Sequence, residues 1–86
     1  MREGGFFKYK KEAYNNAIKQ SNGYSREVSG YELENGEGYI VEDPTGNTRT
    51  KSYNKTVTKG SKSYVKYKGK LFGIKSHFHT HPPTLG

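Results

Sequence analysis

The sequence contains no cysteine, so disulfide bonds and thiolate metal ligands are both excluded. Leu, Ile, Val and Phe are scarce, with 14 of the 86 residues, and this small share predicts a thin hydrophobic core. The eight tyrosines can enlarge that core, because a tyrosine ring buries a large area when its hydroxyl finds a partner. We therefore expect one folded but marginal domain over residues 1–86.

Long apolar segments are also missing. No apolar run approaches the ~18 residues of a transmembrane helix, and the N-terminus lacks the apolar core of a signal peptide. We therefore predict a soluble chain with no membrane partner. Whether the chain is cytoplasmic or part of a larger secreted protein stays open from the sequence.

Acidic residues are absent from the second half of the chain. Residues 1–43 hold six Lys or Arg and all eight acids, whereas residues 44–86 hold nine Lys or Arg and no acid. The basic half is suited to a polyanion partner. In addition, any carboxylate that acts with a group in the second half must come from the first half.

The order of periodic segments predicts the fold class. Apolar residues at helical spacing predict one helix over residues 7–23, ended by Asn22-Gly23. Two strands follow, SREVSGYELE and EGYIVED, joined by the two-residue hairpin signal Asn35-Gly36. Beyond the turn signal DPTGN, three more strands are predicted in TRTKSYNKTVT, SYVKYK and KLFGIKSHFH. This order predicts an α+β domain, with one N-terminal helix packed on a small, mainly antiparallel sheet.

All three histidines fall in the octet SHFHTHPP at residues 76–83, at every second position. Because side chains alternate along a strand, His77 and His79 are expected on one face. The apolar side chains of the same strand are expected on the other face, packed on the helix: Phe72, Ile74 and Phe78. The two prolines that follow His81 prevent further regular pairing.

Two imidazoles with one residue between them can reach one divalent ion from an extended backbone, and zinc with nitrogen and oxygen ligands is the usual catalytic arrangement. His-x-His alone is a weak signal, and the alternative is an exposed strand end without a ligand. Thr80 and Pro82 make the pattern more specific.

HTHP after a hydrophobic strand, with a Glu on an earlier strand, resembles the JAMM/MPN+ (JAB-like) metallopeptidase family, related domains of which occur in bacterial toxin systems. The resemblance implies the first two-thirds of a JAMM/MPN-like (cytidine-deaminase-like) fold, a zinc cofactor, and a peptide or isopeptide-linked protein as substrate. His79 and His81 match the family's zinc-ligand histidines. Glu27 best matches its general base, and Glu32, on the opposite face of the same strand, is the runner-up.

The family motif continues with Ser-x-x-Asp, which supplies the third zinc ligand and an oxyanion partner, and the 86 residues contain no such segment. A site with two histidines is expected to hold zinc weakly, because zinc sites normally have three or four protein ligands. His77 is the candidate substitute, since it shares a strand face with His79. We expect negligible peptidase activity from these 86 residues, and self-association through uncovered apolar surface and an unpaired strand edge.

Lysines and tyrosines are interleaved within residues 49–75, and such mixtures can contact a phosphate backbone and stack bases. A second function therefore stays open: a small basic binding module for nucleic acid or another polyanion, with incidental histidines. The same pattern is typical of a solvated hairpin whose lysines discourage edge pairing. The salt dependence of binding separates these two interpretations.

Overall fold

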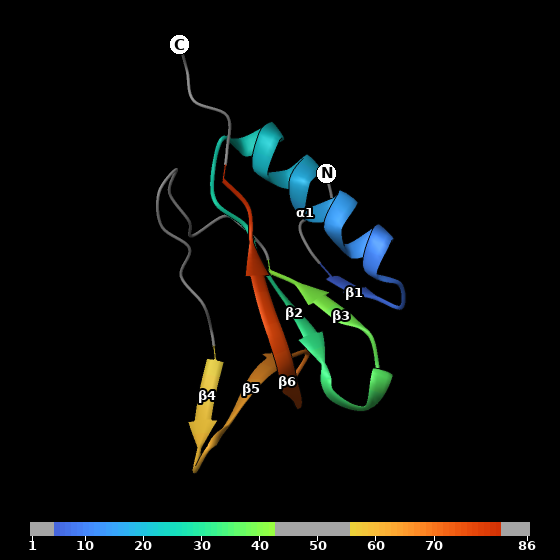
Figure 1. Cartoon of the computed structure of the whole chain (residues 1–86). Helices are drawn as coiled ribbons and strands as arrows, with labels where there is room; N and C mark the ends of the chain where they lie inside the picture. The colour runs from blue at the N-terminus through green and yellow to red at the C-terminus, as the bar shows by residue number, and fades with distance from the viewer. Residues whose placement is uncertain (1–4, 43–55, 82–86) are drawn as a thin grey trace.

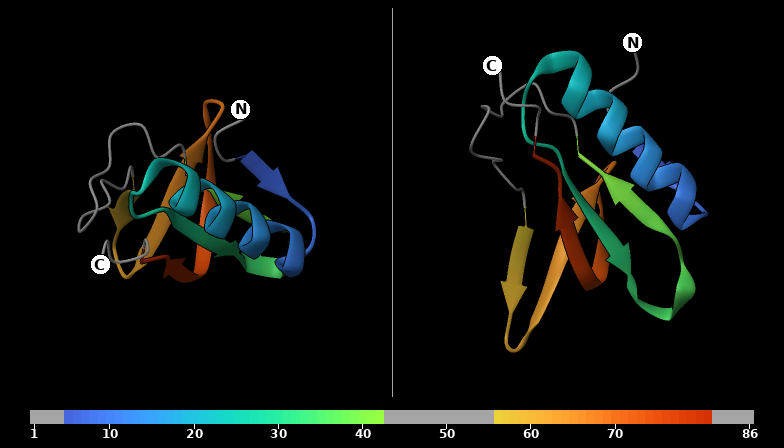
Figure 2. Two further views of the ribbon diagram at one scale, coloured as in Figure 1. Left: turned by 90° about the horizontal axis from the view of Figure 1, so that it is seen from above. Right: turned by 45° about the horizontal axis from the view of Figure 1, so that its top comes forward.

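The computed structural model describes residues 5–42 and 56–81. They form β1 (Gly5–Phe7), α1 (Lys10–Tyr24), β2 (Ser29–Leu33), a 3-10 turn (Glu34–Gly36), β3 (Tyr39–Val41), β4 (Thr56–Lys59), β5 (Lys62–Tyr67) and β6 (Lys70–His79). The strands make one open antiparallel sheet in the order β1-β3-β2-β6-β5-β4 (Figure 1). The helix packs on β1, β2 and β3, at one side of the sheet (Figure 2). The predicted α+β class, with one helix on an antiparallel sheet, is confirmed.

The helix buries a narrow face made of small residues. Ala13 and Ala17 are completely buried, and their short side chains let the helix backbone approach the sheet closely. The helix begins at Lys10, later than predicted, because the preceding residues form β1 and pair with β3, as in the pair Phe7 and Tyr39. This pairing joins segments that are distant in the sequence, so local periodicity could not predict it.

The helix ends at Tyr24, one residue beyond the predicted stop at residues 22–23. The left-handed residue is Ser25, with φ 53°, and its N–H donates to the Ser21 carbonyl. The Ser21 hydroxyl in turn donates to the Arg26 carbonyl at 2.7 Å. These two bonds fix the direction in which the chain leaves the helix and enters β2.

A β-bulge lies in β6, opposite β2. Glu32 pairs with Ser76, but the next residue, Leu33, pairs with Ile74, so that Lys75 is an extra residue in β6. One inserted residue reverses the alternation of side chains along the rest of the strand.

The bulge separates the apolar side chains of β6 into two clusters. Phe78 packs under the helix, with its ring centroid 4.4 Å from that of Tyr14. Phe72 and Ile74 instead pack with Tyr31 in the second cluster. The prediction that Phe72, Ile74 and Phe78 share the helix-facing side is therefore wrong.

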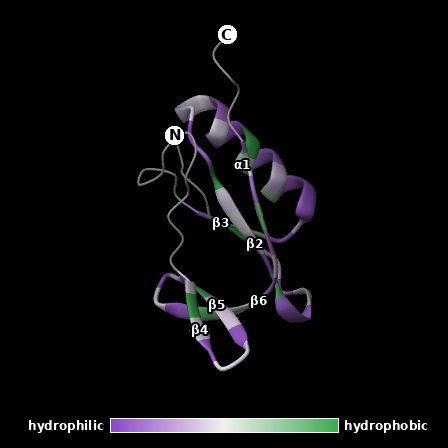
Figure 3. Cartoon of the chain, turned by 60° about the vertical axis from the view of Figure 1, so that its left-hand side comes forward, coloured by the Kyte–Doolittle hydropathy of each residue, from purple (hydrophilic) through white to green (hydrophobic). Residues whose placement is uncertain are grey.

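The two clusters lie on opposite faces of the sheet. The helix-covered cluster contains Ala13, Ala17, Val28 and Val41, with Phe7, Tyr39 and Phe78 packed against it. The second cluster contains Tyr31, Leu33, Ile40 and Val65, with Tyr67, Phe72 and Ile74 packed against it. Hydrophobic residues occur both on α1 and in the strands β4 and β5 (Figure 3). The core is thin, as the composition predicts, because it is divided between two faces.

The hairpin between β2 and β3 is confirmed, but its connection differs from the prediction. Asn35-Gly36 lies in the 3-10 turn, where Asn35 is left-handed with φ 61°, and not in a two-residue loop. The turn predicted at residues 43–47 and most of the segment TRTKSYNKTVT lie outside the described residues; the end of that segment is the exposed strand β4. Within the described ranges, no helix is long and apolar enough to cross a membrane.

Candidate functional site

Thr80 holds the histidine segment against the chain that leaves the helix. Its N–H donates to the Val28 carbonyl at 2.9 Å, and its Oγ1 accepts a bond from the Val28 N–H at 3.1 Å. These bonds extend the β2–β6 pairing one residue beyond the pair Ser29 and His79. The threonine of HTHP therefore fixes the backbone between its two neighbouring histidines.

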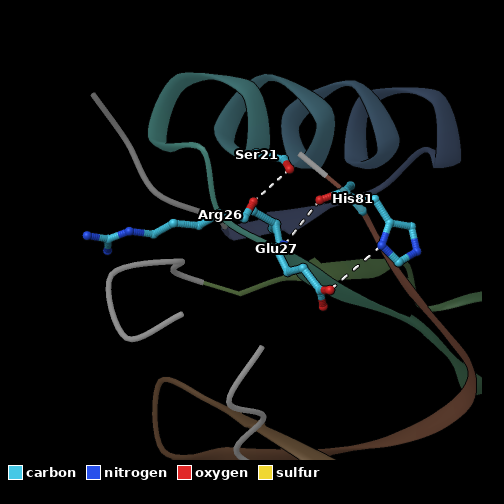
Figure 4. A network of polar contacts seen from close by, with 6 residues as sticks. Ser21, Arg26, Glu27 and His81 are labelled. Atoms are coloured by element: carbon cyan, nitrogen blue, oxygen red, sulfur yellow. Dashed lines mark hydrogen bonds and ion pairs between the residues drawn. The ribbon is translucent and has the colours of Figure 1, made fainter. Parts of the chain in front are cut away.

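The extended pairing places Glu27 beside His81. The Glu27 Oε2 lies 3.7 Å from the His81 Nδ1 (Figure 4), and the contact is an ion pair when the imidazole is protonated. The Glu27 side chain is 13% exposed, whereas that of His81 is 75% exposed. A carboxylate so shielded interacts more strongly with a nearby cation than a fully solvated one does, because solvent and salt screen it less.

The three imidazoles form a row that begins on the end of β6 and continues to His81, two residues beyond it. The ring centroids of His77 and His79 are 5.7 Å apart, and those of His79 and His81 are 4.9 Å apart in an edge-on arrangement. His77 stacks on Tyr31, with 5.6 Å between centroids. His77 and His79 share a face, as the alternation predicts, and His77 stands at the end of the row away from Glu27.

Glu32 lies apart from this row. Its carboxylate accepts a hydrogen bond from the Ser76 hydroxyl at 2.9 Å and lies 3.9 Å from the Lys75 Nζ. The bond to Ser76 is on the helix-facing side of the sheet, opposite the imidazoles. Of the two acids that the sequence offered, the structure brings only Glu27 next to the histidines.

A groove of about 290 Å³ opens between α1 and the end of β6. Its walls include three imidazole or hydroxyl groups and three apolar rings or chains: His79, Thr80, His81, Tyr14, Ile18 and Phe78. Apolar walls with a few convergent polar groups are typical of ligand sites. Sequence reasoning missed the helical side of this groove, although Tyr14 and Ile18 are exposed apolar residues one helical turn apart.

The described residues provide an incomplete donor set. Within residues 5–42 and 56–81, no group of three or more His, Cys, Asp or Glu side chains has the arrangement of a metal site. What the structure brings together is a pair of imidazoles, His79 and His81, with the Glu27 carboxylate against the second of them.

Tyr31, beneath the row, makes stability sensitive to alkaline pH. Burial raises the pKa of its hydroxyl, and the nearby Glu42 carboxylate raises it further. The pKa of Tyr31 in the folded state exceeds its unfolded value. The contribution of the neutral hydroxyl to the free energy of unfolding is therefore complete below pH ~10 and is lost as the pH rises above that value. We expect Tyr31→Phe to flatten the fall in unfolding free energy above about pH 10, measured by urea unfolding. Tyr9→Phe, at an exposed tyrosine, is the control, and equal slopes in both variants would contradict this prediction.

No family model, curated protein or solved structure matches the chain.

Proposed function

We propose that the chain carries a JAMM-like metallopeptidase site that lacks the Ser-x-x-Asp segment, in which His79 and His81 bind zinc weakly and Glu27 occupies the place of the acid–base residue. The observation that supports it most is the contact between Glu27 and His81, at 3.7 Å. It depends on pairing between Val28 and Thr80, which are 52 positions apart in the sequence. The helix followed by antiparallel strands, with His-x-His at a strand end, also supports the JAMM/MPN-like fold as part of this proposal.

His79 and His81 fit zinc as nitrogen ligands, because the two rings are exposed neighbours on one short segment. Two imidazoles leave coordination positions for water or a further ligand, so we expect weak binding. Zinc, when bound, lowers the pKa of a coordinated water and polarises a carbonyl. His77 is the less suitable ligand, since its ring stacks on Tyr31.

Proton transfer, positioning of the histidines and contact with the substrate would fall to different residues of the chain. In a site completed by the Ser-x-x-Asp residues, the Glu27 carboxylate would accept a proton from water held near the histidines and deliver it to the leaving amine of a peptide or isopeptide bond. Thr80 keeps both histidines at a fixed place relative to Glu27. The apolar wall of the groove, with Ile18 and Phe78, accepts a side chain of the substrate and excludes water from one side.

A calorimetric zinc titration of the metal-free chain tests this proposal. We expect one zinc per chain, with affinity that falls in acid because protons compete with zinc for the imidazole nitrogens. A chain that binds no zinc at neutral pH would remove the metallopeptidase proposal.

A second function, polyanion binding, is supported by the charge of β4, β5 and β6. Residues 56–81 contain six lysines and no acid: Lys59, Lys62, Lys66, Lys68, Lys70 and Lys75. The strand register places Lys59, Lys62 and Lys66 on the same face of the hairpin as Tyr64. We propose that this face contacts a phosphate backbone, with the tyrosine available to stack a base.

We expect binding of a single-stranded oligonucleotide to weaken about twentyfold between about 50 and about 200 mM salt, as for three neutralised phosphates. Replacing Lys59, Lys62 and Lys66 by Gln should remove most of this salt dependence, measured by fluorescence anisotropy. The matched control replaces three exposed lysines of α1 by Gln: Lys10, Lys11 and Lys19. Salt-independent binding, or an equal effect of both triple variants, would contradict the assignment.

A further inference from the structure

The C-terminal half of β6 has one strand edge that no described strand occupies. β5 pairs with β6 only from Lys70 to Gly73. β2 pairs with residues 74–79 on the other side of β6. Within the described ranges, residues 74–79 therefore have a strand neighbour on one side alone.

The backbone groups that point to this free edge can be identified from the hydrogen bonds. The Thr80 N–H donates to Val28, toward β2. Backbone N–H and C=O groups point to alternate sides along an antiparallel strand. The N–H and C=O groups of Phe78 and Ser76 therefore also point toward β2. His77 and His79 then direct their N–H and C=O groups to the free edge. Among residues 5–42 and 56–81, no strand pairs with these main-chain donors and acceptors, which lie beside the imidazoles.

A second groove, of about 440 Å³, lies along this edge. Its walls include residues of β6 and of the β4–β5 hairpin, together with Tyr31 of β2 and Glu34 of the 3-10 turn. The free edge is therefore accessible from a groove that can admit an extended chain segment.

Two lysines, Lys62 and Lys75, and one acid, Glu34, line the groove, and each lysine lies near a glutamate. Lys62 lies 3.5 Å from a Glu34 carboxylate oxygen, and Lys75 lies 3.9 Å from one of Glu32. Both lysine side chains are at least 60% exposed, so these ion pairs are weak and exchangeable. Beyond these pairs, residues 56–81 carry four further lysines and no acid, and this excess of positive charge around the groove favours an acidic partner.

We propose that residues 74–79 bind an extended acidic segment of a partner protein, which adds to the sheet as a further strand. Main-chain bonds to His77 and His79 supply affinity, and Lys62 and Lys75 select acidic side chains. This surface depends on the backbone edge and the lysines and not on zinc, so its test is carried out without metal.

The probe is a blocked eight-residue peptide of alternating Val and Glu, titrated into the metal-free chain. His77→Pro removes the N–H that points to the free edge and leaves the β2 pairing intact, as proline is tolerated at strand edges. We expect it to weaken binding at least about tenfold. His77→Ala is the matched control, because it removes the imidazole and keeps the N–H, and we expect a change of less than about twofold.

A second measurement applies even if His77→Pro fails to fold. Two peptides, one N-methylated at the Val residues and the other at the Glu residues, should differ in affinity. Only every second N–H of the peptide faces β6, so one methylated peptide should lose binding and the other should keep it. No binding of the unmethylated peptide, equal loss with both methylated peptides, or equal affinity for a Val-Lys peptide would overturn the proposal. Self-association of the chain without peptide binding would assign the edge to a second copy and would also overturn it.

Discussion

His79→Ala is expected to lower the affinity for zinc by at least about a hundredfold, since it removes one of the two proposed imidazole ligands. His79 stands between the other two histidines, 4.9 Å from the His81 centroid and 5.7 Å from that of His77. Any pair of neighbouring imidazoles in the row therefore includes it. Calorimetric titration of the wild-type chain and the variant measures the effect, with circular dichroism to check folding.

His77→Ala is the matched control for that experiment. It makes the same substitution on the same face of β6, at a ring that stacks on Tyr31 and stands away from Glu27. We expect zinc affinity to change less than about threefold, as for a residue outside the ligand set. If His77→Ala were as damaging as His79→Ala while His81→Ala was harmless, the metal would lie at the wrong end of the row for Glu27.

Gly30→Ala is expected to lower the free energy of unfolding by about 2–3 kcal/mol, a large effect for one methyl group. A Cβ at position 30 would meet the Phe78 ring, within 2.7 Å of its Cε1 and Cε2 atoms. The ring cannot simply rotate away, because it packs on Tyr14 of α1 with centroids 4.4 Å apart. The ring, β6 or the helix must therefore shift.

Chemical unfolding of Gly30→Ala, Phe78→Leu and the double variant isolates this contact. The smaller side chain at position 78 makes room for the added methyl group. The double variant should therefore lose less unfolding free energy than the sum of the losses in the two single variants. Strictly additive losses would show that Gly30 matters for a reason other than the Phe78 ring. Because Phe78 lies between His77 and His79, we also expect Gly30→Ala to weaken zinc binding.

Local patterns predicted those parts of the fold that depend on neighbours in the sequence. Period-two alternation placed His77 and His79 on one face, and helical spacing located the helix that carries Ala13 and Ala17. The bulge at Lys75 was not predictable, because the extra residue is defined by its pairing with β2 and leaves no local signal. The strand β1 was missed for the same reason, since it forms by pairing with β3.

In the candidate site, too, local sequence predicted some features, while others depend on pairing between distant segments. The alternation along the predicted strand SREVSGYELE separated Glu27 from Glu32, and the structure places Glu32 with Ser76 on the other face. The contact between Glu27 and His81 depends on the register between distant segments, and the sequence indicated it only through the family resemblance. The groove beside the histidines needs the end of α1 packed near β6, which no single segment specifies.

Zinc titration followed by NMR of the three histidine rings tests most directly whether Glu27, His79 and His81 form one site. We predict that the ring signals of His79 and His81 shift together and saturate at one zinc per chain, while His77 changes less. Glu27→Gln should alter the His81 ring signals before any zinc is added, because the carboxylate lies against that imidazole. Shifts confined to His77 and His79, or no shift in any ring, would contradict the proposed site.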